Sequence, residues 1–233
     1  GDYWQMTRGG GNGDYRTMVL APSSVQESAD LVYDAFDLAE KYRHPVLILA
    51  DAAIGQMVEG VSLREYREHD IDSGSFAVRG CKKGEKPRLV FNTCYTDPQY
   101  DENLRKKYQS ITDNEQRWEE FQTDDAEIIL VAYGVSARIC KEAVKTARGR
   151  GLKLGLIRPI TLWPFPRKAF DRLGDGVKGI LSVEISALGQ MVDDIKVACD
   201  CRYPVDFVGT YFDVPQVEEI LKKAEQLLRK AEK

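Results

Sequence analysis

The sequence predicts an α/β protein made of two consecutive units with parallel strands, the first of which is incomplete. Short apolar segments of strand length alternate with amphipathic helical segments within residues 1–62, and they do so again within residues 124–233. Because alternating strands and helices are typical of parallel sheets covered by helices, both units are assigned to this class. Residues 63–123 separate the units and are predicted to form a linker with one connecting helix.

The first unit reads as strand, helix and strand. Residues 17–20 form a short strand, and Ser24 with Glu27 three positions later is a capping box, so a helix is predicted from there to about Arg43. Residues 45–51 then form an unbroken apolar strand, which is expected to be buried on both faces. Two strands and a helix do not make a stable domain, so residues 1–62 are interpreted as the end of a larger domain.

The linker shows no clear periodicity up to residue 101. Residues 102–121 are then predicted to be helical, with one apolar side made by Leu104, Tyr108, Ile111, Trp118 and Phe121. The rest of this helix is charged, so it is expected to lie on a surface and to connect the two units.

The second unit repeats the alternation more fully. Strands are predicted at residues 127–133, 152–157, 178–185 and 205–208, and helices near residues 136–148, 167–173, 189–198 and 214–231. The last helix is the clearest, because one of its faces carries Val217, Ile220, Leu221, Ala224, Leu227 and Leu228.

Composition excludes several classes of function. The 233 residues carry a net charge of −4, and the isoelectric point is about 5.4, so no strong basic surface for nucleic acid is expected. The longest aliphatic run, from Val46 to Ala50, is too short to cross a bilayer, and no signal peptide is recognised. These features predict no membrane association and a cytoplasmic location.

The cysteines and histidines do not form a recognisable metal or catalytic set. Five cysteines without regular spacing are interpreted as reduced thiols, namely Cys81, Cys94, Cys140, Cys199 and Cys201. The two histidines, His44 and His69, have no partner at metal-ligand or catalytic spacing. No metal site is therefore predicted on this chain.

The most unusual segment is TRGGGNGDYR at residues 7–16. Three consecutive glycines permit positive φ angles, and Arg8 and Arg16 are suited to pair with carboxylates or phosphates. A phosphate-cradling loop follows a strand and opens a helix, whereas these glycines precede a strand, which argues against a P-loop. Two interpretations stay open: a loop that lines a ligand site or a subunit interface, and a flexible loop near a terminus.

Three further features follow predicted strands. Asp51 lies where ligands bind in parallel sheets, but a cap on the next turn is favoured for it. Glu184 lies at a similar strand end, where a carboxylate either takes part in catalysis or, more often, binds loop N–H groups. The aromatic segment at residues 161–166 is either local core, which is favoured slightly, or an interface anchor. None of these features makes a self-contained active site, and no nucleophile motif occurs.

Five segments resemble one family in order along the chain. They are residues 1–51, IGQMVEG at 54–60, DAEIILVAYGVSAR at 125–138, GLIRPITLWPFP at 155–166 and VEISALGQMVDDI at 183–195. They resemble the alpha subunit of 2-oxoacid:ferredoxin oxidoreductases, especially the 2-oxoisovalerate class. The resemblance implies an incomplete thiamin-diphosphate-binding (pyrimidine-type) domain followed by a transketolase C-terminal-like domain. The segment at residues 185–188 is longer than the corresponding segment of most family members. Residues 209–212 stand where family members often have a glycine-rich segment.

The resemblance also implies an activity and its partners. The complex would decarboxylate a 2-oxoacid to acyl-CoA on thiamine diphosphate with Mg²⁺, which this chain would share with a diphosphate-binding subunit. Electrons would pass through iron–sulfur clusters on partner subunits, with none on this chain, to ferredoxin. The expected partners are the diphosphate-binding, gamma and ferredoxin-like subunits, ferredoxin, the 2-oxoacid and coenzyme A.

No catalytic residue is transferred to this chain by the resemblance. The family's activating glutamate and its Tyr-Pro-Ile-Thr-Pro motif precede the position of Gly1, which suggests a truncated chain that is inactive when isolated. A cofactor-binding or interface region is expected at Arg8, Gly9, Gly10, Gly11 and Asp14. The alternatives are a non-catalytic assembly module, and a transketolase or 2-oxoacid dehydrogenase beta-type subunit.

Overall fold

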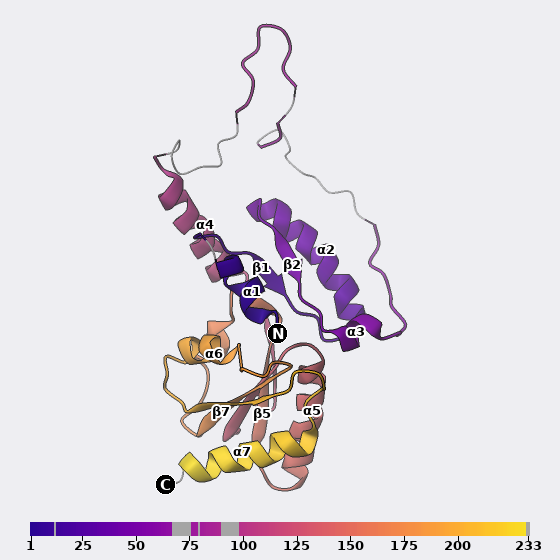
Figure 1. Ribbon diagram of the computed structural model, residues 1–233, viewed down its shortest axis with the longest axis vertical. Helices are drawn as coiled ribbons and strands as arrows, with labels where there is room; N and C mark the ends of the chain where they lie inside the picture. The colour runs from indigo at the N-terminus through magenta and orange to yellow at the C-terminus, as the bar shows by residue number, and fades with distance from the viewer. Residues whose placement is uncertain (12, 67–75, 79, 90–97, 232–233) are drawn as a thin grey trace.

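The structure, a computed structural model, describes residues 1–11, 13–66, 76–78, 80–89 and 98–231. It contains a three-stranded sheet of order β2-β1-β6 and a five-stranded sheet of order β3-β5-β4-β7-β8. In Figure 1 the smaller sheet, with α2 beside it, lies above the larger sheet, which packs against α5 and α7. His69 and Cys94, which figured in the sequence predictions, lie outside the described residues.

The first unit contains the predicted strand, helix and strand. β1 (Met18–Leu20) and β2 (Val46–Ile48) are parallel, and α2 (Val25–Tyr42) connects them. The Ser24 hydroxyl accepts a hydrogen bond from the N–H of Glu27 at 3.1 Å, as the capping box predicts. The Glu27 carboxylate, however, accepts from the N–H of Ser23 rather than Ser24, at 2.7 Å. The box is therefore completed one residue earlier than expected.

The prediction that residues 45–51 are buried on both faces is wrong. Val46, Leu47 and Ile48 are each only half-buried. β2 lies at the edge of the described three-stranded sheet, where it pairs with β1 alone, so one side of its backbone has no neighbouring strand there. The apolar run indicated the strand itself, but its burial depends on which neighbours cover it.

The third strand of the smaller sheet comes from far along the chain. β6 (Thr161–Trp163) is antiparallel to β1, with Val19 opposite Trp163 and Leu20 opposite Thr161. The sequence predicted only an aromatic segment here. A single apolar cluster accordingly contains buried residues of both units, including Val19, Ala21, Ile129, Val131 and Phe170.

The connecting helix is shorter than predicted. α4 runs over Tyr100–Asn114, whereas residues 118–121 form β3 (Trp118–Phe121). Trp118 and Phe121 lie three residues apart, a spacing that suits a helix equally well. In the structure they belong to an edge strand that pairs antiparallel with β5. The larger sheet is therefore mixed rather than wholly parallel, which corrects the prediction for the second unit.

The rest of the second unit follows the predicted order. β4 (Ile128–Val131), β5 (Leu154–Pro159), β7 (Gly179–Glu184) and β8 (Val205–Gly209) are parallel neighbours. The helices are α5 (Gly134–Gly149), α6 (Val192–Ala198) and α7 (Val217–Ala231). The helix predicted near residues 167–173 is only a 3₁₀ turn, Arg167–Ala169. None of the described helices is long and apolar enough to span a bilayer.

Candidate ligand cleft at the strand ends

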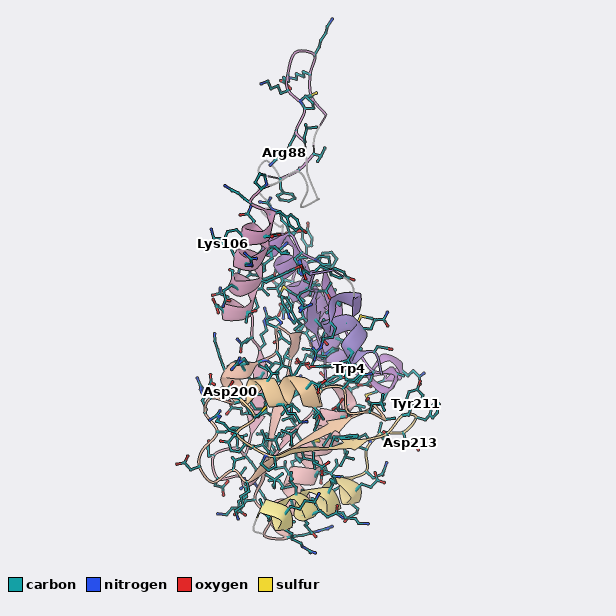
Figure 2. All side chains as sticks on the ribbon, turned by 60° about the vertical axis from the view of Figure 1, so that its left-hand side comes forward. Trp4, Arg88, Lys106, Asp200, Tyr211 and Asp213 are labelled. Carbon is teal, nitrogen blue, oxygen red and sulfur yellow. The ribbon has the colours of Figure 1, made fainter. Side chains whose placement is uncertain are left out.

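The carboxyl ends of strands from both sheets border one cleft of about 420 Å³. Its wall contains Asp51 after β2, Tyr133 after β4 and Glu184 at the end of β7, together with residues 1–3 and 211–214. In Figure 2, Tyr211 and Asp213 lie in the loop at this edge of the molecule. Ligands of parallel α/β proteins bind at such strand ends, so this cleft is the candidate functional site.

Asp51 joins the two units at the cleft. Its Oδ1 accepts a hydrogen bond from the N–H of Ile54 at 2.9 Å and so caps α3 (Ala52–Gln56), as predicted. Its Oδ2 accepts a second bond from the N–H of Val135 at 2.7 Å, at the start of α5, which the sequence did not predict. Gly134 has φ +61°, and a Cβ there would lie 2.4 Å from Asp51 Oδ2, so this close approach requires glycine.

Glu184 binds a loop N–H group, which is one of the two roles that the sequence left open for it. The residue is 2% exposed, and its carboxylate accepts from the Ser182 hydroxyl at 2.6 Å and from the N–H of Met191 at 2.9 Å. Burial raises the pKa of Glu184, although these hydrogen bonds oppose the increase. Because both oxygens already accept hydrogen bonds, the carboxylate fixes the loop before α6.

The cleft has a strongly negative environment. Burial raises the pKa of Tyr133, and the charges of Glu184, Asp51 and Asp2 raise it further. The lining contains four carboxylates, and within the described part of the chain it contains no Lys, Arg or His. It therefore suits cations and hydrogen-bond donors. A diphosphate group does not fit these side chains, because several negative charges would face carboxylates without a compensating cationic side chain among the described lining residues.

The glycine segment lies beside the cleft rather than in its wall. The Arg8 guanidinium pairs with both carboxylate oxygens of Asp194 in α6, at 3.0 and 3.1 Å, and the Tyr3 hydroxyl donates to Asp194 at 2.6 Å. Gly9 has φ +59°, and a Cβ there would overlap the carbonyl of Tyr15. Asp14 is exposed.

The expected site region and the cleft thus contain different residues. Arg8, Gly9, Gly10, Gly11 and Asp14 are absent from the part of the cleft wall that the structure describes. Sequence reasoning missed Asp2, Tyr3, Tyr133 and Asp213. For Tyr133 a signal existed, since it directly follows a buried strand, but the other three are brought to the cleft only by the fold.

Metal-binding and disulfide chemistry find no support in the described residues. No group of three or more His, Cys, Asp or Glu side chains there is arranged to hold a metal ion. Cys140 and Cys199 are buried free thiols, and Cys81 and Cys201 are exposed free thiols. Burial raises the pKa of Cys140, so this thiol stays protonated and unreactive.

The fold and the cleft define the class of protein, which is an α/β protein with two sheets whose strand ends meet at a cleft. Residues 1–122 match the model of the pyruvate flavodoxin/ferredoxin oxidoreductase thiamine-diphosphate-binding family, and residues 126–220 match pyruvate:ferredoxin oxidoreductase core domain II. The first match covers more than half of the chain. The protein therefore belongs to the pyruvate flavodoxin/ferredoxin oxidoreductase family, as its sequence resemblance implied.

Two relatives are similar over most of this chain. It is 45% identical over 232 residues to the ketoisovalerate oxidoreductase subunit VorB of Methanothermobacter marburgensis, covering 97% of this chain and 64% of the relative. It is 48% identical over 207 residues to the VorB subunit of Methanothermobacter thermautotrophicus, covering 87% of this chain and 58% of the relative. The chain thus spans about three fifths of the length of both relatives.

Two solved structures share the fold. One is a 2-oxoglutarate:ferredoxin oxidoreductase from Magnetococcus marinus with 2-oxoglutarate, coenzyme A and succinyl-CoA bound. It matches with a TM-score of 0.74 at 17% identity, over 97% of this chain and 45% of that one. The other is an inactive tetramer of a split-gene transketolase, with a TM-score of 0.51 at 15% identity, over 91% and 57% of the two chains. At these identities the matches show the fold alone.

Proposed function

We propose that this chain is part of a subunit of a thiamine-diphosphate-dependent 2-oxoacid:ferredoxin oxidoreductase that acts on a branched-chain 2-oxoacid. The complex would decarboxylate its substrate to acyl-CoA and pass electrons to ferredoxin. The observation that carries the proposal is the identity of 45–48% to two ketoisovalerate oxidoreductase subunits. The 2-oxoglutarate synthase subunits are less similar, at 29–35%, which favours a branched-chain substrate.

We further propose that the chain consists of an incomplete pyrimidine-type domain followed by a transketolase C-terminal-like domain. We divide the chain into residues 1–62, a linker at 63–123 and residues 124–233. The alternative of a transketolase-type subunit has weaker support, because the structural match is poorer, with a TM-score of 0.51 against 0.74.

The acidic cleft supports a division of labour between subunits. Since its carboxylates do not suit a diphosphate, we assign the diphosphate and its Mg²⁺ to a diphosphate-binding partner subunit. The iron–sulfur clusters would belong to gamma and ferredoxin-like partners. We assign the complex to the cytoplasm, which is consistent with the four free thiols of the described residues.

We propose that the glycine segment forms a subunit contact near the approach to the active centre. The residues concerned are Arg8, Gly9, Gly10, Gly11 and Asp14. Support comes from the anchoring of Arg8 on Asp194 next to the cleft, because the same carboxylate also accepts from Tyr3 in the cleft wall. Asp14 is exposed and thus accessible to a partner.

Calorimetry tests the division of labour. Titration of the isolated chain with thiamine diphosphate and Mg²⁺ is expected to show no binding in the micromolar range. The chain mixed with its diphosphate-binding subunit is expected to bind the cofactor and to oxidise 2-oxoisovalerate faster than 2-oxoglutarate. Micromolar binding by the isolated chain would refute the division of labour, and a preference for 2-oxoglutarate would refute the substrate class.

A further inference from the structure

A second cavity, of about 490 Å³, lies at the opposite ends of the smaller sheet's parallel strands. It is bordered by the residues before β1 and β2 and by residues 100–108 of α4, whereas the acidic cleft lies beyond the carboxyl end of β2. Its lining includes Thr17 and Pro45 from the two strand starts and Asn103 and Leu104 from α4. The proposed oxidoreductase function makes no use of this cavity.

The charge of this cavity is opposite to that of the cleft. Three cationic residues line it, Arg16, Arg43 and Lys107, and no described lining residue is acidic. The Lys107 ammonium donates to the carbonyl of Arg43 at 3.0 Å, and the Arg43 guanidinium lies 4.8 Å from the centre of the Phe76 ring. Burial lowers the pKa of Lys107, and the charge of Arg43 lowers it further. An anion in the cavity would relieve this repulsion.

His44, also in the cavity wall, has a buried ring nitrogen without a partner among the described residues. The residue is 8% exposed, lines the cavity, and its Nε2 makes no hydrogen bond within the described structure. Nε2 has almost no accessible surface, so it lies behind the cavity wall, where the His44 ring packs against Tyr108 and Trp163.

The backbone next to the cavity is compatible with negative charge. α4 is 15 residues long and starts at Tyr100 in the cavity wall, so its amino end is directed there, although the exposed Asp101 and Glu102 in its first turn offset part of its positive dipole. At the opposing carboxyl end of α2, the N–H groups of Arg43 and His44 satisfy the carbonyls of Glu40 and Ala39, which leaves fewer free carbonyl groups there.

The size and the remaining side chains indicate more than an inorganic ion. A cavity of this volume is in the range of organic ligands, and three tyrosines, Tyr15, Tyr100 and Tyr108, contribute to its wall. Aromatic rings suit a planar base, and guanidinium and ammonium groups suit a phosphate. We propose that this cavity binds a nucleotide, with the phosphates near Arg16, Arg43 and Lys107 and the base against the tyrosines.

Calorimetry on the purified chain tests the proposal with ADP, adenosine and inorganic phosphate as probes. ADP is expected to bind at least about tenfold more tightly than adenosine or phosphate, because only ADP uses both parts of the cavity. Lys107→Gln and Arg16→Gln are each expected to weaken ADP binding by about tenfold. The matched control is Lys106→Gln, which removes the same charge from the exposed neighbouring position on α4 and should leave binding unchanged (Figure 2).

Three outcomes would overturn the proposal. They are no ADP binding at millimolar concentration, equal binding of adenosine and ADP, and equal loss in Lys106→Gln and Lys107→Gln. Thermal melting of each variant separates loss of the site from loss of the fold, and Arg16→Gln is an independent variant if Lys107→Gln unfolds. The result leaves the oxidoreductase proposal untouched, because that test uses thiamine diphosphate and a partner subunit.

Discussion

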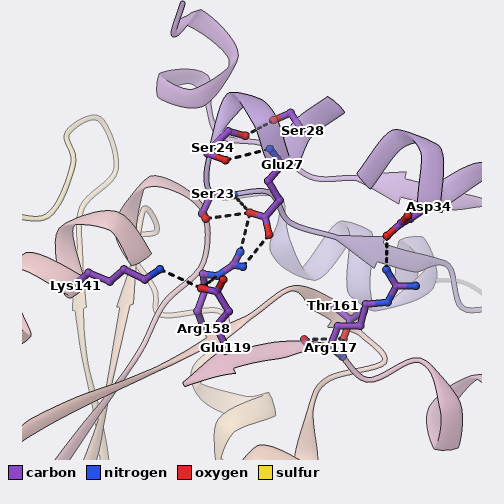
Figure 3. Close-up of polar contacts among 10 residues, drawn as sticks. All are labelled: Ser23, Ser24, Glu27, Ser28, Asp34, Arg117, Glu119, Lys141, Arg158 and Thr161. Atoms are coloured by element: carbon purple, nitrogen blue, oxygen red, sulfur yellow. Dashed lines mark hydrogen bonds and ion pairs between the residues drawn. The ribbon is translucent and has the colours of Figure 1, made fainter. Parts of the chain in front are cut away.

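The guanidinium of Arg158, at the end of β5, holds the carboxylate of Glu27, in the first turn of α2, through two hydrogen bonds of 3.0 and 2.8 Å (Figure 3). The Arg158 side chain is 1% exposed, and its Nε also donates to Glu119 at 2.9 Å. Glu119 in turn pairs with Lys141. This network, centred on the buried Arg158 guanidinium, connects α2 to two strands of the larger sheet, β3 and β5.

Neutralising Glu27 is expected to destabilise the fold. Glu27→Gln keeps the size and the capping acceptor but leaves Arg158 with one carboxylate, so we expect a loss of about 3 kcal/mol in the free energy of unfolding. Urea unfolding monitored by circular dichroism measures it. The exposed residue Glu142 pairs only loosely with Lys145, at 3.7 Å, so Glu142→Gln should cost less than about 0.5 kcal/mol.

A double variant separates the buried charge from general damage. Removing the cation too, in Glu27→Gln with Arg158→Met, is expected to be less destabilising than Glu27→Gln alone, because no unpaired buried charge remains. Glu119 keeps its contact with Lys141 in that background. Additive losses in the two single variants would show that the ion pair is not the source of the effect.

Asp51 supports a prediction about the junction between the units. Asp51→Ala removes the cap of α3 and leaves the N–H of Val135 without its acceptor, so we expect a loss of about 2–3 kcal/mol. Asp51→Asn supplies only one carbonyl oxygen and should recover only part of this loss. Chemical denaturation compares the three proteins, and full recovery by Asn would contradict the role of the second carboxylate oxygen.

His44 makes stability depend on pH. Burial, and then the charge of Lys107, lowers the pKa of His44 from 6.5 to about 4 in the folded protein, against a smaller opposing contribution from the Arg16 backbone. Between these values the unfolded chain binds more protons, so stability is full above pH 6.5 and is lost as the pH falls towards 4. The loss between pH 7.5 and pH 5 is expected to be about 2 kcal/mol.

The variant His44→Gln isolates this contribution, because glutamine does not titrate. Urea midpoints of both proteins at pH 7.5 and pH 5 give the difference in stability at each pH. The difference should shift in favour of the variant at pH 5. A constant difference at both values would mean that His44 does not titrate as its buried environment requires.

Two glycines in the second unit should respond oppositely to the same substitution. A Cβ at Gly155 in β5 would lie 2.7 Å from the carbonyl oxygen of Gln122, whereas one at Gly149, the last residue of α5, meets no atom within 4 Å. Gly155→Ala is therefore expected to cost about 1–3 kcal/mol. Gly149→Ala should be neutral or stabilise by up to about 1 kcal/mol, as thermal melting would show.

The local sequence pattern was sufficient to predict those helices and caps that are stabilised by interactions between residues close together in the chain. The helix after Ser24 begins where its hydroxyl caps the chain, and Asp51 caps the next helix for the same reason. The apolar face that predicted the last helix contains Ile220, Leu221, Ala224 and Leu227, all buried against the larger sheet. These interactions span three or four residues, so the residue types and their spacing in the sequence indicate them directly.

Local pattern failed where a segment has two acceptable structures. Trp118 and Phe121 fit a helical face, and only the opposing residues of β5 make them an edge strand. The sequence likewise did not reveal that Thr161–Trp163 would complete the smaller sheet, since the partner strand β1 lies far away in the chain. Strand pairing between distant segments depends on the packing of the whole molecule. The periodicity of one segment gives no information about that packing.

By itself, the sequence determined the alternation of strands and helices, the capping residues and, through its motifs, the family. The tertiary structure alone decided which side chains meet: Arg8 with Asp194, Glu27 with Arg158, and Asp51 with the start of α5. The physical reason is that caps and amphipathic faces depend on neighbours a few residues away. Clefts and ion pairs between units depend instead on positions that only the packed sheets bring together.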